Sequence, residues 1–134
     1  MADKFMRTVV AMSFILAMAL FSSCGTNNTQ IMDDNNGKQI TVQTGDIVTV
    51  TLVSNPTTGY SWQVMLIDNS ILIQDGGPEY KESPDAEGLV GTGGTETFRF
   101  KAIRAGETSL ELGYMRPWES VQPIETFTIK VVVQ

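Results

Sequence analysis

Side chains suited to binding are concentrated in the segment NPTTGYSW, which begins at Asn55 and lies between two runs of alternating apolar residues. Pro56 fixes its own φ angle and disfavours helical geometry at Asn55. The β-branched side chains of Thr57 and Thr58 have few χ1 rotamers, and Gly59 can adopt a positive φ. These residue types predict a stiff loop that loses little conformational entropy when a partner binds it. A plain turn between two strands would also fit.

A second segment, GTGG, contains Gly91, Thr92, Gly93 and Gly94. It is not a phosphate-binding loop, because no helix is expected after it and the Lys-Ser/Thr pair of nucleotide motifs is missing. Taken alone, it predicts a flexible entry into the next strand.

A third segment, MRPW, places Arg116, Pro117 and Trp118 in a turn. A tryptophan after a proline and beside an arginine is poorly explained by core packing. Tryptophan and arginine are the residue types that dominate binding hot spots. The segment is consistent either with an ordinary turn or with an exposed contact site.

Residue types exclude most hydrolase chemistries and the metal sites built on histidine and cysteine. The chain has no histidine, and Cys24 is its single cysteine. It therefore cannot form a Ser-His-Asp triad, a Cys-His pair or a His/Cys metal site. A carboxylate pair such as Glu119 and Glu125, or a lysine-activated serine, remains possible, but no motif indicates either. We expect no enzyme activity, no metal and no cofactor.

The overall charge limits the possible partners. The 134 residues carry a formal net charge of −6. Nucleic acid is not expected to bind such a chain. No basic patch is available to hold an anionic membrane surface, so membrane attachment would need acyl chains. We expect a monomer.

The elements that must position these segments are strands. Short runs of alternating apolar residues, separated by turn signals, are expected at 39–43, 46–54, 60–67, 71–74, 79–81, 95–103, 107–115 and 124–134. One face of 60–67 would carry Tyr60, Trp62, Val64 and Leu66, which assigns Trp62 to the core. The fold class is all-β, an immunoglobulin-like β-sandwich of about seven to eight antiparallel strands. In such a sandwich the three unusual loops would share one end.

The segments NPTTGYSW, GTGG and YMRPW, in this order and spacing, resemble the signature loops of the chagasin-like inhibitors of papain-family cysteine peptidases. The similarity covers about 38–134. Tyr60 matches a position at which the family motif has Phe or Tyr. The resemblance implies a reversible inhibitor whose three loops form a wedge in the active-site cleft of a papain-like cysteine peptidase.

The same resemblance implies a role for each loop. Thr57 and Thr58 would lie over the catalytic cysteine, in a loop shaped by the residues around them. The residues from Gly91 to Gly94 would run beside the non-primed subsites, and Arg116 and Trp118 would dock on the primed side. The expected peptidase-binding residues are Asn55, Pro56, Thr57, Thr58, Gly59, Tyr60, Gly91, Thr92, Gly93, Gly94, Arg116, Pro117 and Trp118.

Residues 1–23 have the pattern of a secretory signal peptide. Lys4 and Arg7 precede the apolar run TVVAMSFILAMALF, which is too short to span a membrane. The run ends at FSSC, which resembles the lipobox of bacterial lipoproteins and implies lipidation of Cys24. The chain would then be lipid-anchored in the cell envelope. Ordinary cleavage nearby would instead give a free secreted protein.

Residues 24–36 are rich in Asn, Asp, Thr and Gly, and we expect a tether there. The inhibitor domain would then cover 37–134, a length at which one sandwich can bury a sufficient core.

An exported immunoglobulin-like module for glycan or protein binding is the alternative function. It would use Trp118, Tyr60 and Tyr80 as an aromatic platform.

Overall fold

The computed structural model describes residues 25–86 and 91–134. The predicted signal peptide over 1–23 and the predicted lipidation site, Cys24, lie outside the described residues. No helix in the described part of the chain is long and apolar enough to cross a membrane.

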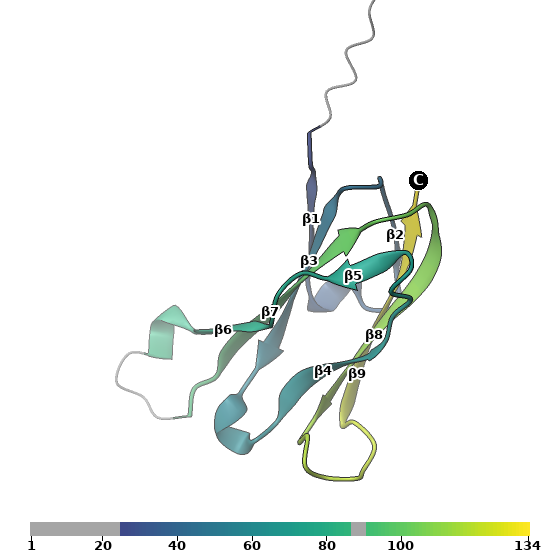
Figure 1. Ribbon diagram of the computed structural model, residues 1–134. Coiled ribbons are helices and arrows are strands. Elements are labelled where there is room, and N and C mark those ends of the chain that lie inside the picture. The colour runs from purple at the N-terminus through teal and green to yellow at the C-terminus, as the bar shows by residue number, and fades with distance from the viewer. Residues whose placement is uncertain (1–24, 87–90) are drawn as a thin grey trace, which may run out of the picture.

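The described residues form nine strands in two sheets that pack face to face (Figure 1). The first sheet contains β1 (Asn28–Ile31), β3 (Ile47–Ser54), β7 (Gly94–Ala102), β5 (Leu72–Gln74) and β6 (Glu79–Glu82). The second contains β2 (Gln39–Val42), β9 (Glu125–Val133), β8 (Gly106–Met115) and β4 (Ser61–Leu66). Single-turn 3₁₀ helices lie at η1 (Asp33–Asn35), η2 (Pro56–Thr58) and η3 (Pro84–Ala86).

The predicted all-β sandwich is confirmed, and each predicted strand is present with its ends within one residue of the prediction. The sheets are mixed rather than wholly antiparallel. β1 pairs in parallel with β3, and β2 pairs in parallel with β9. All other pairings are antiparallel. Both parallel strands, β1 and β2, are edge strands of their sheets.

The prediction of a tether over 24–36 is wrong for the segment that holds β1 and η1. Ile31 in β1 is only 2% exposed and belongs to the core. The backbone N–H of Asn27 donates to the carboxylate of Asp46 at 3.1 Å, which fastens the start of the strand. A single apolar residue among polar ones gives no periodic signal, and its partner β3 lies almost twenty residues further along the chain.

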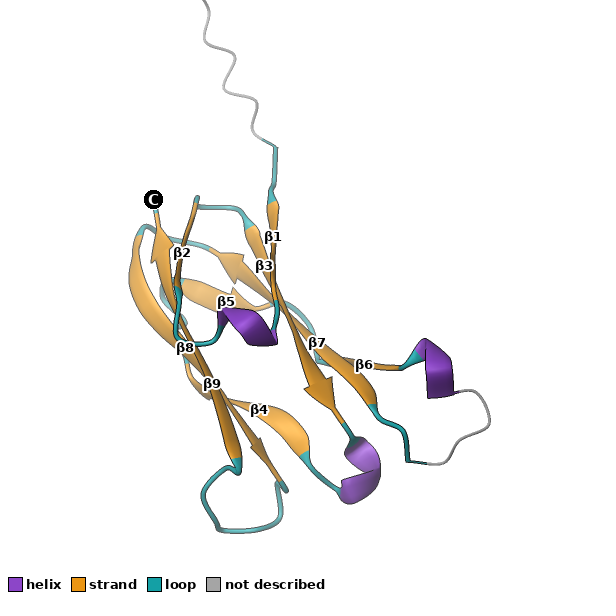
Figure 2. Ribbon diagram, turned by 180° about the vertical axis from the view of Figure 1, so that it is seen from behind, coloured by secondary structure: helices purple, strands orange, loops and turns teal. Residues whose placement is uncertain are grey.

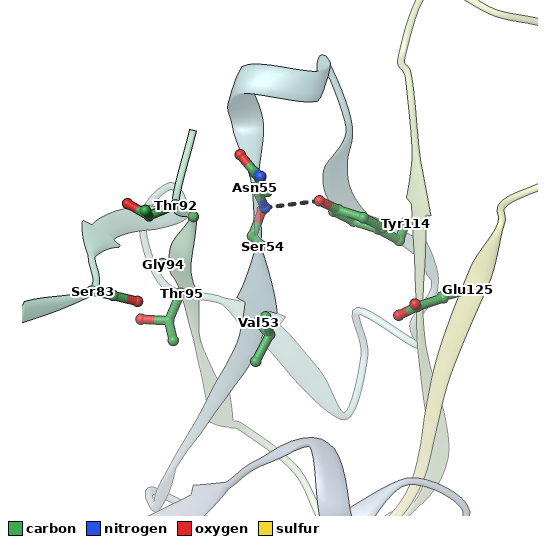
Figure 3. Close-up of a pocket in the computed structure, with 10 residues that line it drawn as sticks. Val53, Ser54, Asn55, Ser83, Thr92, Gly94, Thr95, Tyr114 and Glu125 are labelled. Carbon is green, nitrogen blue, oxygen red and sulfur yellow. Dashed lines mark hydrogen bonds between the residues drawn. The ribbon is translucent and has the colours of Figure 1, made fainter. Parts of the chain in front are cut away.

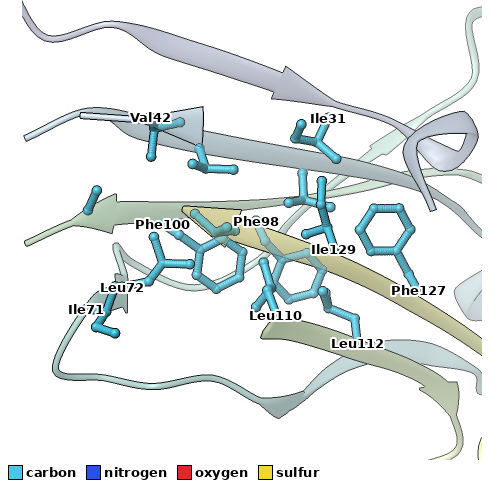
Figure 4. Packing of buried hydrophobic residues seen from close by; sticks show 14 of the residues in the cluster. Ile31, Val42, Ile71, Leu72, Phe98, Phe100, Leu110, Leu112, Phe127 and Ile129 are labelled. Atoms are coloured by element: carbon cyan, nitrogen blue, oxygen red, sulfur yellow. The ribbon is translucent and has the colours of Figure 1, made fainter. Parts of the chain in front are cut away.

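The core lies between the sheets and follows the predicted alternation (Figure 4). Burying each large apolar side chain contributes roughly 1.5–3 kcal/mol. The fully or almost fully buried residues include Val48, Val50, Leu52, Phe98, Phe100, Leu110, Leu112, Phe127, Ile129 and Val131. Trp62 is 3% exposed, which confirms its assignment to the core.

The prediction that Leu66 lies on the same strand face as Trp62 and Val64 is wrong. A bulge between Val64 and Leu66 shifts the register of β4 against β8. Because strand side chains alternate with period two, one extra residue turns the following side chain to the other face. Leu66 is therefore 52% exposed.

Three connections lie toward the end of the sandwich opposite the C-terminus: the β3–β4 loop with η2, the described part of the β6–β7 connection, and the β8–β9 loop. Both ribbon views show this arrangement (Figures 1 and 2). The three segments singled out in the sequence lie in these connections and in the adjoining ends of the strands. The sandwich therefore brings together residues that are up to about sixty positions apart.

Candidate functional site

The β3–β4 loop is a single tight turn. Pro56 opens η2, and Gly59 closes it in the left-handed conformation with a φ of 81°. The N–H of Gly59 donates to the carbonyl of Pro56 at 3.0 Å. The hydroxyl of Thr58 donates to the carbonyl of Asn55 at 2.6 Å. The predicted stiffness of this loop therefore has both backbone and side-chain causes.

Asn55 joins the β3–β4 loop to its neighbours. Its side-chain amide donates to the carbonyl of Gly91 at 3.0 Å, which connects it to the β6–β7 connection. Its side-chain oxygen accepts the hydroxyl of Thr57 at 2.6 Å. Its backbone N–H donates to the hydroxyl of Tyr114 at 2.8 Å (Figure 3). One asparagine thus fixes the start of the turn, its exposed threonine and the adjacent connection.

The glycine segment passes close to the backbone of β3. A Cβ on Gly93 would lie 3.1 Å from the carbonyl oxygen of Ser54, and Gly93 has a φ of 75°. Gly93 and Gly94 are buried, whereas Gly91 and Thr92 are exposed. Of the four residues, only the first two can therefore present a surface to a partner.

Arg116 in the β8–β9 loop is held by three groups. Its Nε donates to the carbonyl of Thr58 at 3.1 Å. Its Nη1 forms an ion pair with Glu119 at 3.2 Å, and its guanidinium carbon lies 4.5 Å from the ring centroid of Tyr60. A guanidinium over an aromatic face is an attractive arrangement. Arg116 therefore joins the third loop to the first.

Trp118 is 70% exposed, the largest value among the exposed large apolar residues of the described chain. Its ring passes Gly59 so closely that a Cβ there would lie 2.6 Å from Cη2. The indole is therefore partly oriented by the first loop while most of its surface faces solvent. Pro117 beside it is also exposed.

Three aromatic rings, those of Trp62, Tyr114 and Tyr60, pack in a row between the core and the loops. The ring of Tyr114 lies 5.1 Å from that of Trp62 and 5.5 Å from that of Tyr60. The row runs from the core at Trp62 to the cation at Arg116. Such tilted aromatic pairs contribute roughly 0.5–1.5 kcal/mol each beyond their buried area.

The sequence did not identify Tyr114, Ser54 and Glu96 as part of the site. Tyr114 follows the alternation of Leu110 and Leu112, so its pattern predicts only a core-facing ring and says nothing about the hydroxyl. Glu96 did have a signal, since it precedes Phe98 by two residues and so lies on the buried face of β7. A carboxylate at such a position is unusual.

A hollow of about 460 Å³ lies beside the β3–β4 loop (Figure 3). Ser54, Asn55, Thr92, Tyr114 and Glu125 are among its lining residues. These are hydroxyl and amide groups with one carboxylate. In the described part of the chain, no three His, Cys, Asp or Glu residues are grouped as metal ligands would be.

The site is an exposed binding surface and not an enclosed pocket. Three interlocked loops on a rigid sandwich expose a threonine-tipped turn, the first half of a glycine-rich connection and a tryptophan. The model of the chagasin family of peptidase inhibitors, I42, matches residues 41–131, and the chain belongs to this family.

Two relatives illustrate the similarity. Amoebiasin-1 of Entamoeba histolytica is 36% identical over 107 residues, which cover 78% of this chain and 98% of that protein. Chagasin of Trypanosoma cruzi is 36% identical over 95 residues, covering 63% of this chain and 77% of chagasin.

Solved structures share the fold. The crystal structure of the cysteine protease inhibitor EhICP2 from Entamoeba histolytica has a TM-score of 0.71 and 23% identity, and the match covers 81% of this chain and 97% of that one. PbICP-C, in its structure in complex with falcipain-2, has a TM-score of 0.50 and 21% identity over 81% of this chain and 91% of that one.

Proposed function

We propose that this chain is a reversible inhibitor of papain-like cysteine peptidases that blocks the active-site cleft with a wedge of three loops. The wedge comprises Asn55–Tyr60, Gly91–Gly94 and Arg116–Trp118. One observation supports the proposal above all: hydrogen bonds from Asn55 to Gly91 and from Arg116 to Thr58 join all three loops into one surface. Membership of the chagasin family, and the likeness to an inhibitor solved in complex with falcipain-2, support it independently.

The exposed turn of Pro56, Thr57 and Thr58 forms the apex of the wedge and lies over the catalytic cysteine of the enzyme. Both threonine hydroxyls already bond to Asn55, so the apex is preorganised in the free protein. Little conformational entropy is then lost on docking, and a standard interface of roughly 1,600 Å² can give nanomolar affinity. The left-handed Gly59 and the β-branched threonines also make the turn a poor substrate strand.

The other two loops flank the apex. Gly91 and Thr92 contact the enzyme on the non-primed side, whereas the buried Gly93 and Gly94 shape the connection. Trp118 is the anchor on the primed side because most of its indole is free for contact. Arg116 acts mainly by locking the loops, since its guanidinium already has partners within the chain.

The alternative of an aromatic platform for glycans has weaker support. Tyr60 is covered by Arg116, so its face is not open to a sugar. Tyr80 is 41% exposed but lies on β6, in the sheet opposite to the β8–β9 loop that carries Trp118. A catalytic pair of Glu119 and Glu125 is weakened in the same way, because Glu119 is ion-paired with Arg116.

Inhibition assays test the proposal directly. The chain from residue 25 onwards, which keeps β1, would be titrated against papain and a papain-like cathepsin, with trypsin as the control enzyme. We expect tight, reversible inhibition of the two cysteine peptidases alone. Absence of inhibition at micromolar protein, with circular dichroism showing a folded sample, would overturn the proposal.

We also propose that Cys24 is lipidated and holds the inhibitor in the cell envelope. Only residues 25–27 separate it from β1, which starts at the end of the sandwich opposite to the three loops (Figure 1). An anchor there would point the wedge away from the membrane, toward soluble peptidases. Incorporation of labelled palmitate into the wild type but not into the Cys24→Ser variant would support the anchor, and equal labelling would refute it.

A further inference from the structure

Glu96 is a carboxylate in an unusual place. It lies on β7, is only 6% exposed, and precedes the core residues Phe98 and Phe100 on the same face. Taking an ionised carboxylate out of water costs several kcal/mol unless hydrogen bonds replace the lost hydration. None of the ion pairs found in the described ranges involves Glu96. Hydrogen bonds must therefore account for its presence.

The two oxygens of Glu96 bond to the two stems of the β3–β4 loop. The hydroxyl of Ser54 donates to Oε1 at 2.6 Å, and the backbone N–H of Trp62 donates to Oε2 at 3.0 Å. Ser54 is the last residue of β3, and Trp62 is the second residue of β4. The carboxylate thus closes the base of the turn that runs between them.

The contact to Trp62 also bridges the two sheets. β4 is the outermost strand of its sheet, so one edge of it has no strand partner. The Trp62 N–H finds its acceptor on Glu96, which belongs to the opposite sheet. The indole Nε1 of Trp62 donates to the carbonyl of Val53 in β3 at 2.9 Å, which is a second hydrogen bond between the two sheets. The spacing of the two stems is therefore set by side chains and not by sheet pairing.

Glu96 also links this base to the second loop. It lies two residues after Gly94, where the glycine-rich connection enters β7. The charge of Glu96 also acts on Tyr80. Partial burial of the Tyr80 ring, together with the negative charges of Glu82 and Glu96, raises the pKa of Tyr80 above its ordinary value of 10.0. One carboxylate therefore connects the exit of the second loop to both stems of the first.

We propose that Glu96 is a positioning residue of the inhibitory wedge: by holding Ser54 and Trp62 at a fixed separation, it sets how the Pro56–Thr58 apex is presented. The inference rests on the proposed function, because the apex matters only if it enters a peptidase cleft. Glu96 itself is buried and does not touch the enzyme. A neutral apolar residue would keep the core but would leave both stem donors without an acceptor.

The test compares two variants with a matched control in the full chain. Glu96→Gln keeps the shape and can still accept the Trp62 N–H while donating to Ser54. Glu96→Met removes both acceptors. Val133→Ala, a buried position at the end of β9 away from the loops, serves as a control that lowers stability alone. Denaturant unfolding first establishes conditions in which every variant is folded.

Two readouts are then taken. The first is the dissociation rate from papain, and the second is amide hydrogen exchange at residues 58–62 of the free protein. For Glu96→Met we expect dissociation to be roughly ten- to a hundredfold faster, since each lost charge-assisted hydrogen bond is equivalent to about tenfold or more. Exchange should accelerate in the same variant. Glu96→Gln should restore both to within about threefold, and Val133→Ala should change neither.

Unchanged dissociation and unchanged exchange in Glu96→Met would overturn the inference, as would an equal effect of Val133→Ala. If Glu96→Met does not fold, Ser54→Ala decides: it removes one stem bond, and wild-type dissociation and exchange in that variant would overturn the inference. Failure of the proposed function gives a different result. The wild type would then not inhibit papain, while exchange at 58–62 would still report whether Glu96 holds the loop.

Discussion

The backbone N–H of Asn55 donates to the phenolic hydroxyl of Tyr114 across 2.8 Å. This bond joins the first residue of the β3–β4 turn to the strand that leads into Arg116 and Trp118. Because Asn55 also bonds to Gly91, the hydroxyl of Tyr114 helps to fix the residue that joins the first loop to the second. Tyr114 thus contacts the first loop both through its hydroxyl, at Asn55, and through its ring, beside Tyr60.

Tyr114→Phe should weaken inhibition of papain about three- to tenfold and lower the free energy of unfolding by about 1 kcal/mol, the usual effect of one hydrogen bond. The ring would keep its contacts with Trp62 and Tyr60. Tyr60→Phe is the matched control, because Tyr60 acts through its ring beneath Arg116. Inhibition constants and urea unfolding of both variants give the comparison. Equal effects of the two substitutions would show that the Tyr114 hydroxyl has no special role.

Gly59→Ala should impair inhibition more than tenfold. The φ of 81° is costly for a residue with a Cβ, by about 1–2 kcal/mol, and the new atom would meet the indole of Trp118. The loop and the tryptophan would both have to move. Titration against papain measures the effect on the wedge.

Gly45→Ala is the control for Gly59→Ala. Gly45 has a φ of 97°, but nothing lies within 4 Å of its added Cβ, and it precedes β3 at the other end of the sandwich. We expect a similar loss of stability with wild-type inhibition. A loss of inhibition in Gly45→Ala would mean that general destabilisation, and not the contact with Trp118, explains the result at Gly59.

The two tryptophans should respond in opposite ways. Trp118→Ala removes a side chain that is 70% exposed, so the melting temperature should stay within about 2 °C. Inhibition should weaken by about 2 kcal/mol or more, as expected for an anchor at an interface. Trp62→Ala, by contrast, should lower stability by about 3–5 kcal/mol because Trp62 is buried. A stability loss in Trp118→Ala with unchanged inhibition would mean that the indole packs rather than binds.

The sequence predicted the features that depend on local pattern. Strands such as β3, β7 and β9 alternate apolar and polar residues over eight or nine positions, and the period alone locates them. The sequence also predicted the turn at Pro56, because proline restricts φ and glycine permits a positive φ. Placing the three loops at one end then followed from the topology of a sandwich.

The features that sequence reasoning missed depend on contacts between distant residues. β1 is held by pairing with β3 and by a single buried isoleucine, which no periodicity shows. The bulge after Val64 reverses the facing of Leu66 without any glycine or proline to mark it. The hydrogen bonds from Asn55 to Tyr114 and from Trp62 to Glu96 join positions more than thirty residues apart, and residue type alone does not specify them.

Asp46 connects β1 to the turn before β3 and makes the fold sensitive to acid. Its carboxylate accepts the N–H of Gln43 at 2.9 Å and that of Asn27 at 3.1 Å. These two bonds, that from Gln43 first, hold the pKa of Asp46 below its ordinary value of 3.8. Hydrogen bonds from the hydroxyl and N–H of Ser70 lower the pKa of Asp68 in the same way.

A lowered pKa in the folded state means that the unfolded chain binds the proton more readily, so acid favours unfolding. The contribution of Asp46 to stability should be complete above the ordinary pKa of 3.8 and should be lost as the pH falls through the lower folded-state value. Asp46→Asn should therefore be less stable than the wild type at pH 7, with a difference that shrinks toward about pH 3. Urea unfolding at several pH values measures this. Inhibition at pH 7 should be unchanged because Asp46 lies at the start of β3, away from the loops. A difference that stayed constant between pH 7 and pH 3 would show that Asp46 acts through packing rather than through its charge.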